Sequence, residues 1–450
     1  MKRTLIFKIS CLFIFIINWS QVFSQDGSWH FFGLPDEEIE SIAINPQNDS
    51  ILYAGSSSDF SAGTFGSIFK SYNAGLTWDT LVYGLSVSDI VIDHKNINVV
   101  YAALMPVSFS PPGILKTTDG GANWFWSHTG ITVSWELGVA TLEINPLYTD
   151  TIYAGTTGPL GGRIYKSINE GLYWNDITNN APPGLRDGIL DIALNPLNPD
   201  VIFSTTNFSG NLYKSWNGGI NWIQIMVPWQ GYNLVRSIII DPINPDIMYA
   251  AVGSYGLMKS LNFGFDWLSI TNGLPINGVG NATMDPHYHH FLFIATDNGI
   301  YWTIDAGMNW FNIGLKNRIV YQLAMSSDGQ KLYAATDSGI YRNEFPFITH
   351  IEKPGELILG FHLSQNYPNP FNSETHIEYT LPKSIWIKLN IYDLSGKLIK
   401  VLVNDNKQAG HHTARWNGKD DSGKTVASGV YIYHISSAEY TESRKLVYLK

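Results

Sequence analysis

Hydrophobic and polar residues alternate in short runs along most of the chain. Segments such as ILDIALNP (189–196) and VRSIIIDP (235–242) place apolar residues at alternating positions and end in Asn or Asp followed by Pro. A period of two is typical of β-strands with one buried face, and Asn, Pro and Asp are typical of the turns between them. No segment shows the period of a helix, so the pattern predicts an all-β fold.

A nine-residue segment recurs six times between residues 70 and 310. The copies are KSYNAGLTW (70–78), KTTDGGANW (116–124), KSINEGLYW (166–174), KSWNGGINW (214–222), KSLNFGFDW (259–267) and WTIDAGMNW (302–310). Their tryptophans are separated by about 43 to 50 residues, the spacing of propeller blades. Each unit also holds two short apolar strands before the segment, so four short strands per unit predict the blades of a β-propeller.

The repeated segment resembles the Asp-box, or BNR repeat, with the pattern S/T-x-D/N-x-G-x-x-W. Each copy is expected to form the turn between the third and fourth strands of a blade. Its Asn or Asp oxygen accepts backbone N–H groups of its own turn, its Gly takes a positive φ, and its Trp packs between blades. Four of the six acidic-type positions are Asn, which argues against calcium. We interpret the following residues as structural: Asn73, Trp78, Asp119, Trp124, Asn169, Trp174, Asn217, Trp222, Asn262, Trp267, Asp305 and Trp310.

The number of blades follows from the first strands. Seven of them end near residues 45, 93, 145, 195, 241, 285 and 326, but the last unit stops after SGIYRN (338–343) without an outer strand. The segment GSWHFFGLP (27–35) has the same order of Trp, strand and Gly-Leu-Pro as DWLSITNGLP (266–275). We therefore predict a seven-bladed β-propeller over residues 25–347, closed by an outer strand from residues 28–32, with Trp29 in the place of a motif tryptophan.

The pattern changes after residue 347. A linker (348–360) leads to short alternating strands over residues 361–450, which predict a small immunoglobulin-like β-sandwich. This block is similar to the type A C-terminal sorting domain of the type IX secretion system of Bacteroidetes-like bacteria, through QNYPNPFN (365–372), IYDLSGKLI (391–399), WNGKDDSGKTVASGVYIY (416–433) and KLVYLK (445–450). The resemblance implies that residues 361–450 are recognised by the outer-membrane machinery and then removed, with the rest released or attached to the surface.

The N-terminal residues predict export across the inner membrane. Basic Lys2, Arg3 and Lys8, an apolar run (9–19) and small Ser24 have the layout of a secretory signal peptide over residues 1–24. We expect a mature chain that is secreted or at the outer-membrane cell surface. The sole cysteine lies in this segment, so the mature chain relies on its core rather than on disulfides.

Charge and hydropathy exclude some partners. The net charge is −10, with no cluster of Lys and Arg, which argues against nucleic acid. No later segment is apolar and long enough to be a transmembrane span of the mature chain.

Polar side chains are expected to ring the central channel. The position four residues before each first-strand end is polar in all seven units: Ser41, Asp89, Thr141, Asp191, Ser237, Asn281 and Gln322. Two residues before the end, the third unit adds Glu143. Asp89, Glu143 and Asp191 come from adjacent blades and are the candidate catalytic carboxylates. The alternative interpretation is a hydrated channel whose polar groups bond to water.

The face opposite the Asp-box turns carries long, variable loops, and binding residues tend to lie on such loops. Trp135, Trp229 and Tyr232 are candidate ligand-binding aromatics that would stack on sugar rings or grip a protein. The alternative is that they pack as local core at the blade ends.

Single Asp-box propellers with short blades also resemble the photosystem-assembly-factor type, which binds partners and catalyses nothing. The leading prediction is a secreted or cell-surface binding module for a glycan or protein, rather than an enzyme, with no cofactor and no metal. The alternative is a glycoside hydrolase, xyloglucanase- or sialidase-like, that uses channel carboxylates. A third is a structural surface-layer component.

The enzyme alternatives lack parts of their patterns. The sialidase Arg-Ile-Pro segment is absent, although Arg186, Arg236 and Arg318 lie near first-strand starts. Xyloglucan hydrolases usually pair two propellers, and one is present here. The histidines of HYHH (287–290) have no evident supporting partners for zinc.

Overall fold

The computed structural model describes residues 29–58, 65–106, 112–134, 136–159, 161–178, 180–207, 209–229, 233–274, 278–345, 361–366, 368–381, 384–394, 396–408, 410–437 and 440–449. Regular structure in these ranges is almost entirely β-strand, with two short 3₁₀ helices, η1 (Pro183–Arg186) and η2 (Gly253–Tyr255). The chain divides into two compact units, residues 1–348 and 349–450. Among the described residues, no helix has the length and hydropathy that a membrane crossing requires.

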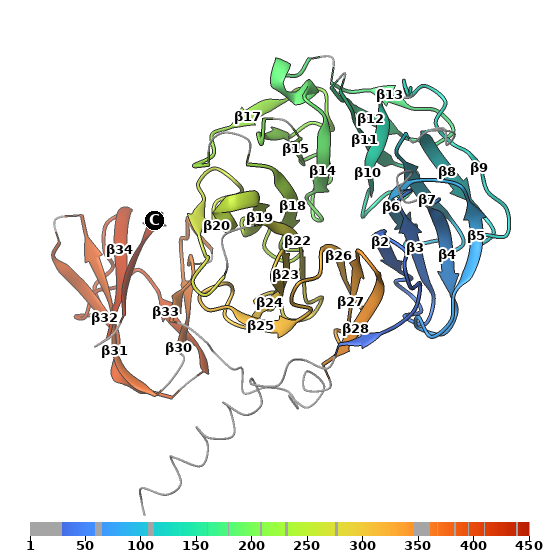
Figure 1. Cartoon of the computed structure of the whole chain (residues 1–450). Coiled ribbons are helices and arrows are strands. Elements are labelled where there is room, and N and C mark those ends of the chain that lie inside the picture. The colour runs from blue at the N-terminus through green and yellow to red at the C-terminus, as the bar shows by residue number, and fades with distance from the viewer. Residues whose placement is uncertain are drawn as a thin grey trace, which may run out of the picture. The chain divides into compact units, whose positions relative to one another are not determined.

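Seven four-stranded antiparallel sheets form the first unit, which is a β-propeller (Figure 1). Blades 1 to 3 contain β2 (Ile39–Ile44), β3 (Leu52–Ser56), β4 (Ser67–Ser71) and β5 (Asp79–Tyr83); β6 (Val87–Ile92), β7 (Val100–Leu104), β8 (Gly113–Thr117) and β9 (Phe125–Trp126); and β10 (Gly138–Ile144), β11 (Ile152–Thr157), β12 (Ile164–Ser167) and β13 (Asn175–Asp176).

Blades 4 to 7 follow the same order around the ring. They contain β14 (Ile189–Leu194), β15 (Ile202–Thr206), β16 (Leu212–Ser215) and β17 (Ile223–Ile225); β18 (Val235–Ile240), β19 (Met248–Val252), β20 (Gly256–Ser260) and β21 (Leu268–Ser269); β22 (Val279–Met284), β23 (Leu292–Thr296), β24 (Gly299–Thr303) and β25 (Phe311–Gly314); and β26 (Val320–Met325), β27 (Lys331–Thr336), β28 (Gly339–Glu344) and β1 (His30–Phe31).

The hydrophobic cores lie between neighbouring blades. One cluster joins Tyr333 and Ala335 of blade 7 to Ile39 and Ile42 of blade 1, so the first and last blades share a core. The second strand of a blade, such as β7, is buried at every position because both of its faces pack against a neighbouring blade. This explains why β7 is apolar throughout instead of alternating.

The N-terminus closes the ring, as predicted. Strand β1 pairs with β28 in antiparallel register, and the Phe32 N–H donates to the Ile340 carbonyl oxygen at 2.8 Å. The indole N–H of Trp29 donates to the Ile313 carbonyl oxygen at 2.7 Å. Four of the six motif tryptophans make the same contact to the preceding blade, for example Trp174 to the Ser127 carbonyl oxygen at 2.7 Å. Trp29 therefore occupies the equivalent place in blade 7.

The six motif turns share one network of hydrogen bonds. In each, the Asn or Asp Oδ1 accepts the backbone N–H four residues later, at 2.8–3.0 Å. The Ser or Thr oxygen two residues before it accepts the N–H of the motif glycine, at 2.9–3.1 Å. The glycine and the residue before it both take positive φ, as in Ala74 (56°) and Gly75 (88°). The Asn or Asp and Ser or Thr side-chain oxygens of each motif thus accept hydrogen bonds within their own turn. The motif tryptophans that are buried are Trp174, Trp222, Trp267 and Trp310, and those that are half-buried are Trp78 and Trp124.

A second regular contact joins the blades through the residue that begins each motif, a position to which the sequence analysis assigned no role. This residue is a lysine in five of the six motifs, and Arg342 takes its place in blade 7. Its cationic group donates to the carbonyl oxygen of the residue before the motif glycine in the next blade. The pairs are Lys70 to Gly120 (2.6 Å), Lys116 to Glu170 (2.9 Å), Lys166 to Gly218 (3.4 Å), Lys214 to Phe263 (3.3 Å), Lys259 to Ala306 (3.4 Å) and, across the closure, Arg342 to Ala74 (3.1 Å).

Blade 6 lacks this lysine contact, because blade 7 offers no motif turn to receive it. It carries Trp302 at the lysine position, and blade 7 has no motif turn whose carbonyl a lysine would bind. The Trp302 ring instead stacks on Phe345, with ring centroids 5.8 Å apart. The exception shows that the lysines belong to the contact between blades.

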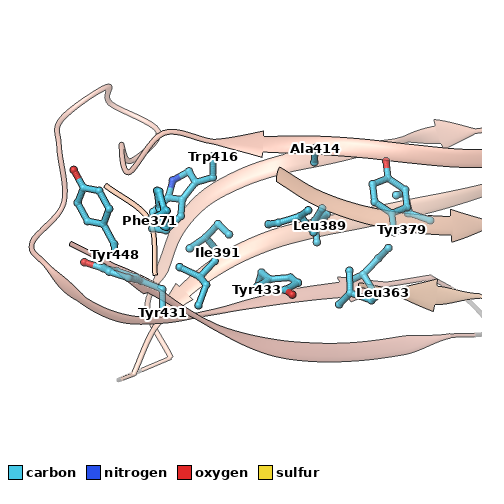
Figure 2. Packing of buried hydrophobic residues seen from close by; sticks show 14 of the residues in the cluster. Leu363, Phe371, Tyr379, Leu389, Ile391, Ala414, Trp416, Tyr431, Tyr433 and Tyr448 are labelled. Atoms are coloured by element: carbon cyan, nitrogen blue, oxygen red, sulfur yellow. The ribbon is translucent and has the colours of Figure 1, made fainter. Parts of the chain in front are cut away.

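The second unit is a β-sandwich of two sheets. The three-stranded sheet contains β29 (His362–Leu363), β30 (Thr375–Leu381) and β33 (Gly410–Trp416), and the four-stranded sheet contains β32 (Leu398–Lys407), β31 (Ile385–Asp393), β34 (Gly429–Ser436) and β35 (Thr441–Tyr448). Figure 2 shows Leu389, Ile391 and Tyr433 of the larger sheet within the core that also holds Trp416 and Tyr379 of the smaller one.

The Asn- and Pro-rich segment at residues 365–372 is fixed to the last strand. The Phe371 N–H donates to the Val447 carbonyl oxygen at 3.0 Å, and the Val447 N–H donates to Asn369 Oδ1 at 2.9 Å. The Phe371 ring is buried in the core (Figure 2). Asn366, also buried, donates from Nδ2 to Thr375 Oγ1 at 2.8 Å. The first and last segments of this unit therefore stabilise each other.

Candidate binding site at the mouth of the central channel

Every innermost strand carries a β-bulge at the same place. The register of pairing with the second strand shifts there in all seven blades. A bulge leaves one residue unpaired and redirects its side chain. The bulge residues form a ring at one end of the channel: Glu40, Ser88, Ala140, Leu190, Arg236, Gly280 and Tyr321.

The polar residues next to the bulges connect the blades. Five of them accept a hydrogen bond from a backbone N–H in the first strand of the next blade: Ser41 from Ile90 (3.0 Å), Asp89 from Leu142 (2.8 Å), Asp191 from Ile238 (2.7 Å), Asn281 from Leu323 (3.1 Å) and Gln322 from Ile42 (2.7 Å). The expectation of groups that bond only to channel water is therefore wrong for these five residues. Their acceptors satisfy backbone donors between blades.

Two of the candidate catalytic carboxylates belong to this set. Asp89 also accepts its neighbour's N–H, from Ile90 at 2.9 Å. Burial raises the pKa of Asp89 to about 6, against the lowering effect of these N–H groups. Burial and the Asp89 charge likewise raise the pKa of Asp191 to about 6, against the lowering effect of the Ile238 N–H. Both carboxyl groups are bound to backbone, so neither is free to act on a substrate without breaking contacts between blades.

Glu143 differs from these two residues. No hydrogen bond or ion pair involves its side chain among the described residues, and it is half-buried in the channel. Burial raises its pKa well above the usual value, and the charges of Asp191 and Asp89 raise it further. Glu143 and Asp191 line a cavity of about 420 Å³ at the end of the channel near the motif turns. The structure thus brings the three predicted carboxyl groups close enough to influence one another.

The opposite end of the channel opens into a second cavity of about 410 Å³, here called the channel mouth. Its lining includes Glu40, Asp89, Asp191, Arg236, Asp297 and Tyr321. Neither Glu40 nor the exposed Arg236 has a hydrogen bond or ion pair within the described part of the chain. Burial and then the charge of Glu38 raise the pKa of Glu40 to about 7, while Arg236 opposes this rise.

The bulge residues were missed by the sequence analysis, although the sequence carries a signal for them. Buried apolar residues of a regular strand are two positions apart, but here two of them stand three apart in every first strand, as Val235 and Ile238 do. That extra position is the bulge. A search for it would have found Glu40 and Arg236.

The predicted aromatic residues do not form a site in the described structure. Trp229 is only 3% exposed, packs edge-to-face on Trp267 with centroids 5.8 Å apart, and donates its indole N–H to the Gly210 carbonyl oxygen at 2.9 Å. The expectation that Trp229 is exposed for stacking is therefore wrong, because the loop folds it into the core between blades. Trp135 and Tyr232 lie outside the described residues.

The arginines and histidines named from the sequence are also dispersed. The lining of the channel mouth contains Arg236 but neither Arg186 nor Arg318. Arg318 pairs with Asp337 at 3.7 Å. His289 bonds through Nδ1 to Asp241 Oδ1 at 2.9 Å, a contact between blades 5 and 6. Among the described residues there is no group of three or more His, Cys, Asp or Glu side chains that would hold a metal ion.

Comparison with known proteins supports the fold. Residues 370–440 match the family described as FlgD Ig-like domain. Over 185 residues the chain is 26% identical to a xyloglucanase from Paenibacillus sp, a match that covers 36% of this chain and 17% of that enzyme. The chain therefore matches less than a fifth of that enzyme's length.

Two solved structures cover most of the propeller. YCF48 from Cyanidioschyzon merolae aligns with a TM-score of 0.52 and 14% identity, over 71% of this chain and 98% of that chain. YCF48 bound to D1 peptide aligns with a TM-score of 0.50 and 14% identity, over 70% of this chain and 96% of that chain. At such identities the likeness shows the β-propeller fold alone.

Proposed function

We propose that this protein is an exported, secreted or cell-surface binding module whose ligand, a protein or a glycan, enters the channel mouth. The observation that supports this most is the contrast within the channel. Asp89 and Asp191 are bound to backbone N–H groups, whereas Glu40 and Arg236 face the open mouth without partners in the described structure. Unpaired charged groups around a concave opening suit recognition of a polar ligand.

A peptide-binding propeller among the structural neighbours favours a protein ligand. The alignment with YCF48 bound to D1 peptide covers 96% of that chain and 70% of this one. Function does not follow from fold, so this likeness raises the case for a peptide ligand without identifying one.

Export is proposed to use two signals. Residues 1–24 have the layout of a signal peptide, and residues 361–450 resemble a type IX sorting domain, with the six turn segments resembling Asp-boxes. The sandwich supports this proposal because its Asn- and Pro-rich segment and its last strand form one packed unit. A chain that ends at residue 360 should reach the periplasm but not the medium, whereas equal secretion of both chains would contradict the proposal.

A glycoside hydrolase is the second candidate function, favoured by the xyloglucanase match and by Glu143 beside Asp191. Hydrolysis by two carboxyl groups requires one that stays protonated and one that is ionised. The raised pKa of Glu143 suits the first role. Asp191 is held by the Ile238 N–H at 2.7 Å, which does not suit the second.

The deciding experiment uses the mature chain, residues 25–450. It is applied to a glycan array, to a peptide array and, separately, to xyloglucan with detection of released sugars. Binding without released sugar is expected. Sugar release that Glu143→Gln abolishes would establish the hydrolase and contradict the binding module.

A further inference from the structure

The charges around the channel mouth are arranged asymmetrically. Blades 7 and 1 contribute Tyr321 and Glu40 to the lining, and blade 5 contributes Arg236. The intervening bulge positions on blades 2 to 4 are Ser88, Ala140 and Leu190, which are small or apolar. The acidic residues of the lining, Glu40, Asp89, Asp191 and Asp297, come from blades 1, 2, 4 and 6, against the single guanidinium of Arg236.

Tyr321 connects the mouth to Glu38, a carboxylate that does not belong to the described lining. The Tyr321 hydroxyl group donates to Glu38 Oε1, which fixes this carboxylate beside Glu40. Glu38 is near enough for its charge to disfavour the ionised form of Glu40. Two neighbouring carboxylates without a cation between them repel each other, and a bound cation removes that repulsion.

The walls of the mouth suit a narrow, partly apolar group. Leu190 and the half-exposed Ile319 supply apolar contact, and Gly280 leaves room because it has no Cβ atom. Tyr321 is the one aromatic residue in the described lining, and its hydroxyl is already bound to Glu38. A sugar ring would lack an aromatic face to stack on, whereas an aliphatic stem with a charged end would be accommodated.

We infer that the channel mouth binds a basic side chain, lysine or arginine, of a protein partner, with the cationic group against Glu40. This inference rests on the proposed binding function and names the chemistry of its ligand. Arg236 orients the partner, because its charge repels a second cation and attracts an acidic neighbour of the bound residue. Asp89, Asp191 and Asp297 add negative potential to the mouth, although Asp89 and Asp191 are bound to backbone.

The test measures binding of three labelled pentapeptides to the mature chain by titration. They are acetyl-Gly-Gly-Lys-Gly-Gly-amide and the versions with norleucine or acetyl-lysine at the centre. The lysine peptide is expected to bind about tenfold more tightly than either control, the factor for one charge-assisted hydrogen bond. Glu40→Gln should remove that advantage, and Tyr321→Phe should reduce it. Asp79→Asn, an equal charge change on the exposed outer strand of blade 1, should leave it unchanged.

The affinity should also depend on pH in a defined direction. Glu40 must be ionised to bind a cation, and its pKa is raised to about 7. The lysine peptide should therefore bind more tightly at about pH 8 than at about pH 6. Glu40→Gln should reduce this difference, because only Asp89 and Asp191 of the lining, with pKa values of about 6, would still ionise over that range.

Four outcomes would contradict the inference. Equal binding of the norleucine and lysine peptides is one, and unchanged binding in a folded Glu40→Gln variant is another. Preferential binding of a glucosamine hexamer over every peptide would assign the mouth to an amino sugar instead of a protein. If a ligand found on the arrays binds with the same affinity to Glu40→Gln, the inference is refuted, while the proposed binding function still stands.

Discussion

The motif turns and the channel mouth are both rich in polar residues, but they use them in opposite ways. In a motif turn, Asn217 Oδ1 accepts the Asn221 N–H at 2.9 Å, and Lys166 reaches the Gly218 carbonyl of the same turn at 3.4 Å. At the mouth, Glu40 and Arg236 lack such partners among the described residues. Residue types that are the same in nearly every blade serve the architecture, and the positions that differ from blade to blade are available for binding.

The largest expected effect concerns closure of the ring. Deleting residues 29–33 removes β1 and the Trp29 side chain that fills the site between blades 6 and 7. Loss of a fully buried aromatic costs about 3–5 kcal/mol; Trp29 is half-buried, but the deletion also removes the pairing of β1 with β28. At about 2–4 °C per kcal/mol, the midpoint of thermal unfolding should fall by about 10 °C. The control His30→Ala keeps the strand and changes an exposed side chain. An unchanged midpoint after the deletion would mean that β1 does not stabilise the ring.

A smaller effect is expected for the lysine contact between blades. Lys116 is nearly buried and donates to the Glu170 carbonyl oxygen at 2.9 Å. Lys116→Met leaves that carbonyl without this donor, which should cost about 1–3 kcal/mol. Thermal unfolding measures this against Lys316→Met, which changes an exposed lysine. Equal midpoints for the two variants would show that the Lys116 contact does not stabilise the propeller.

The pH dependence of stability should follow the channel carboxyl groups. Burial raises the pKa of Glu143, so the folded state binds its proton more tightly than the unfolded state does. The resulting stabilisation is present at low pH and is lost as the pH rises through the folded-state pKa. Glu143→Gln, which breaks no side-chain hydrogen bond among the described residues, should raise the unfolding midpoint at about pH 8 and change it little at about pH 4. A lower midpoint at pH 8 would show that the Glu143 carboxylate is stabilised in the channel.

Much of the fold could be predicted from local patterns, because the blades repeat. Strand alternation, the motif and the likeness of residues 27–35 to residues 266–275 were sufficient for seven blades and their closure. The burial of Trp229 could not be predicted, since it depends on a loop that folds back over Trp267. Asp89 and Asp191 were placed correctly in the channel, but their backbone donors come from the next blade and leave no local signal.

The central claim is that the motif turns are architecture and the channel mouth is the binding site. The most direct test compares Glu40→Gln with Asn217→Ala in the mature chain. For each variant, the unfolding midpoint and the affinity for the lysine pentapeptide are measured. Glu40→Gln should weaken binding about tenfold without lowering the midpoint. Asn217→Ala should lower the free energy of unfolding by about 1 kcal/mol, and with it the unfolding midpoint, without changing the affinity. The opposite pattern, with binding lost in Asn217→Ala and retained in Glu40→Gln, would contradict the account.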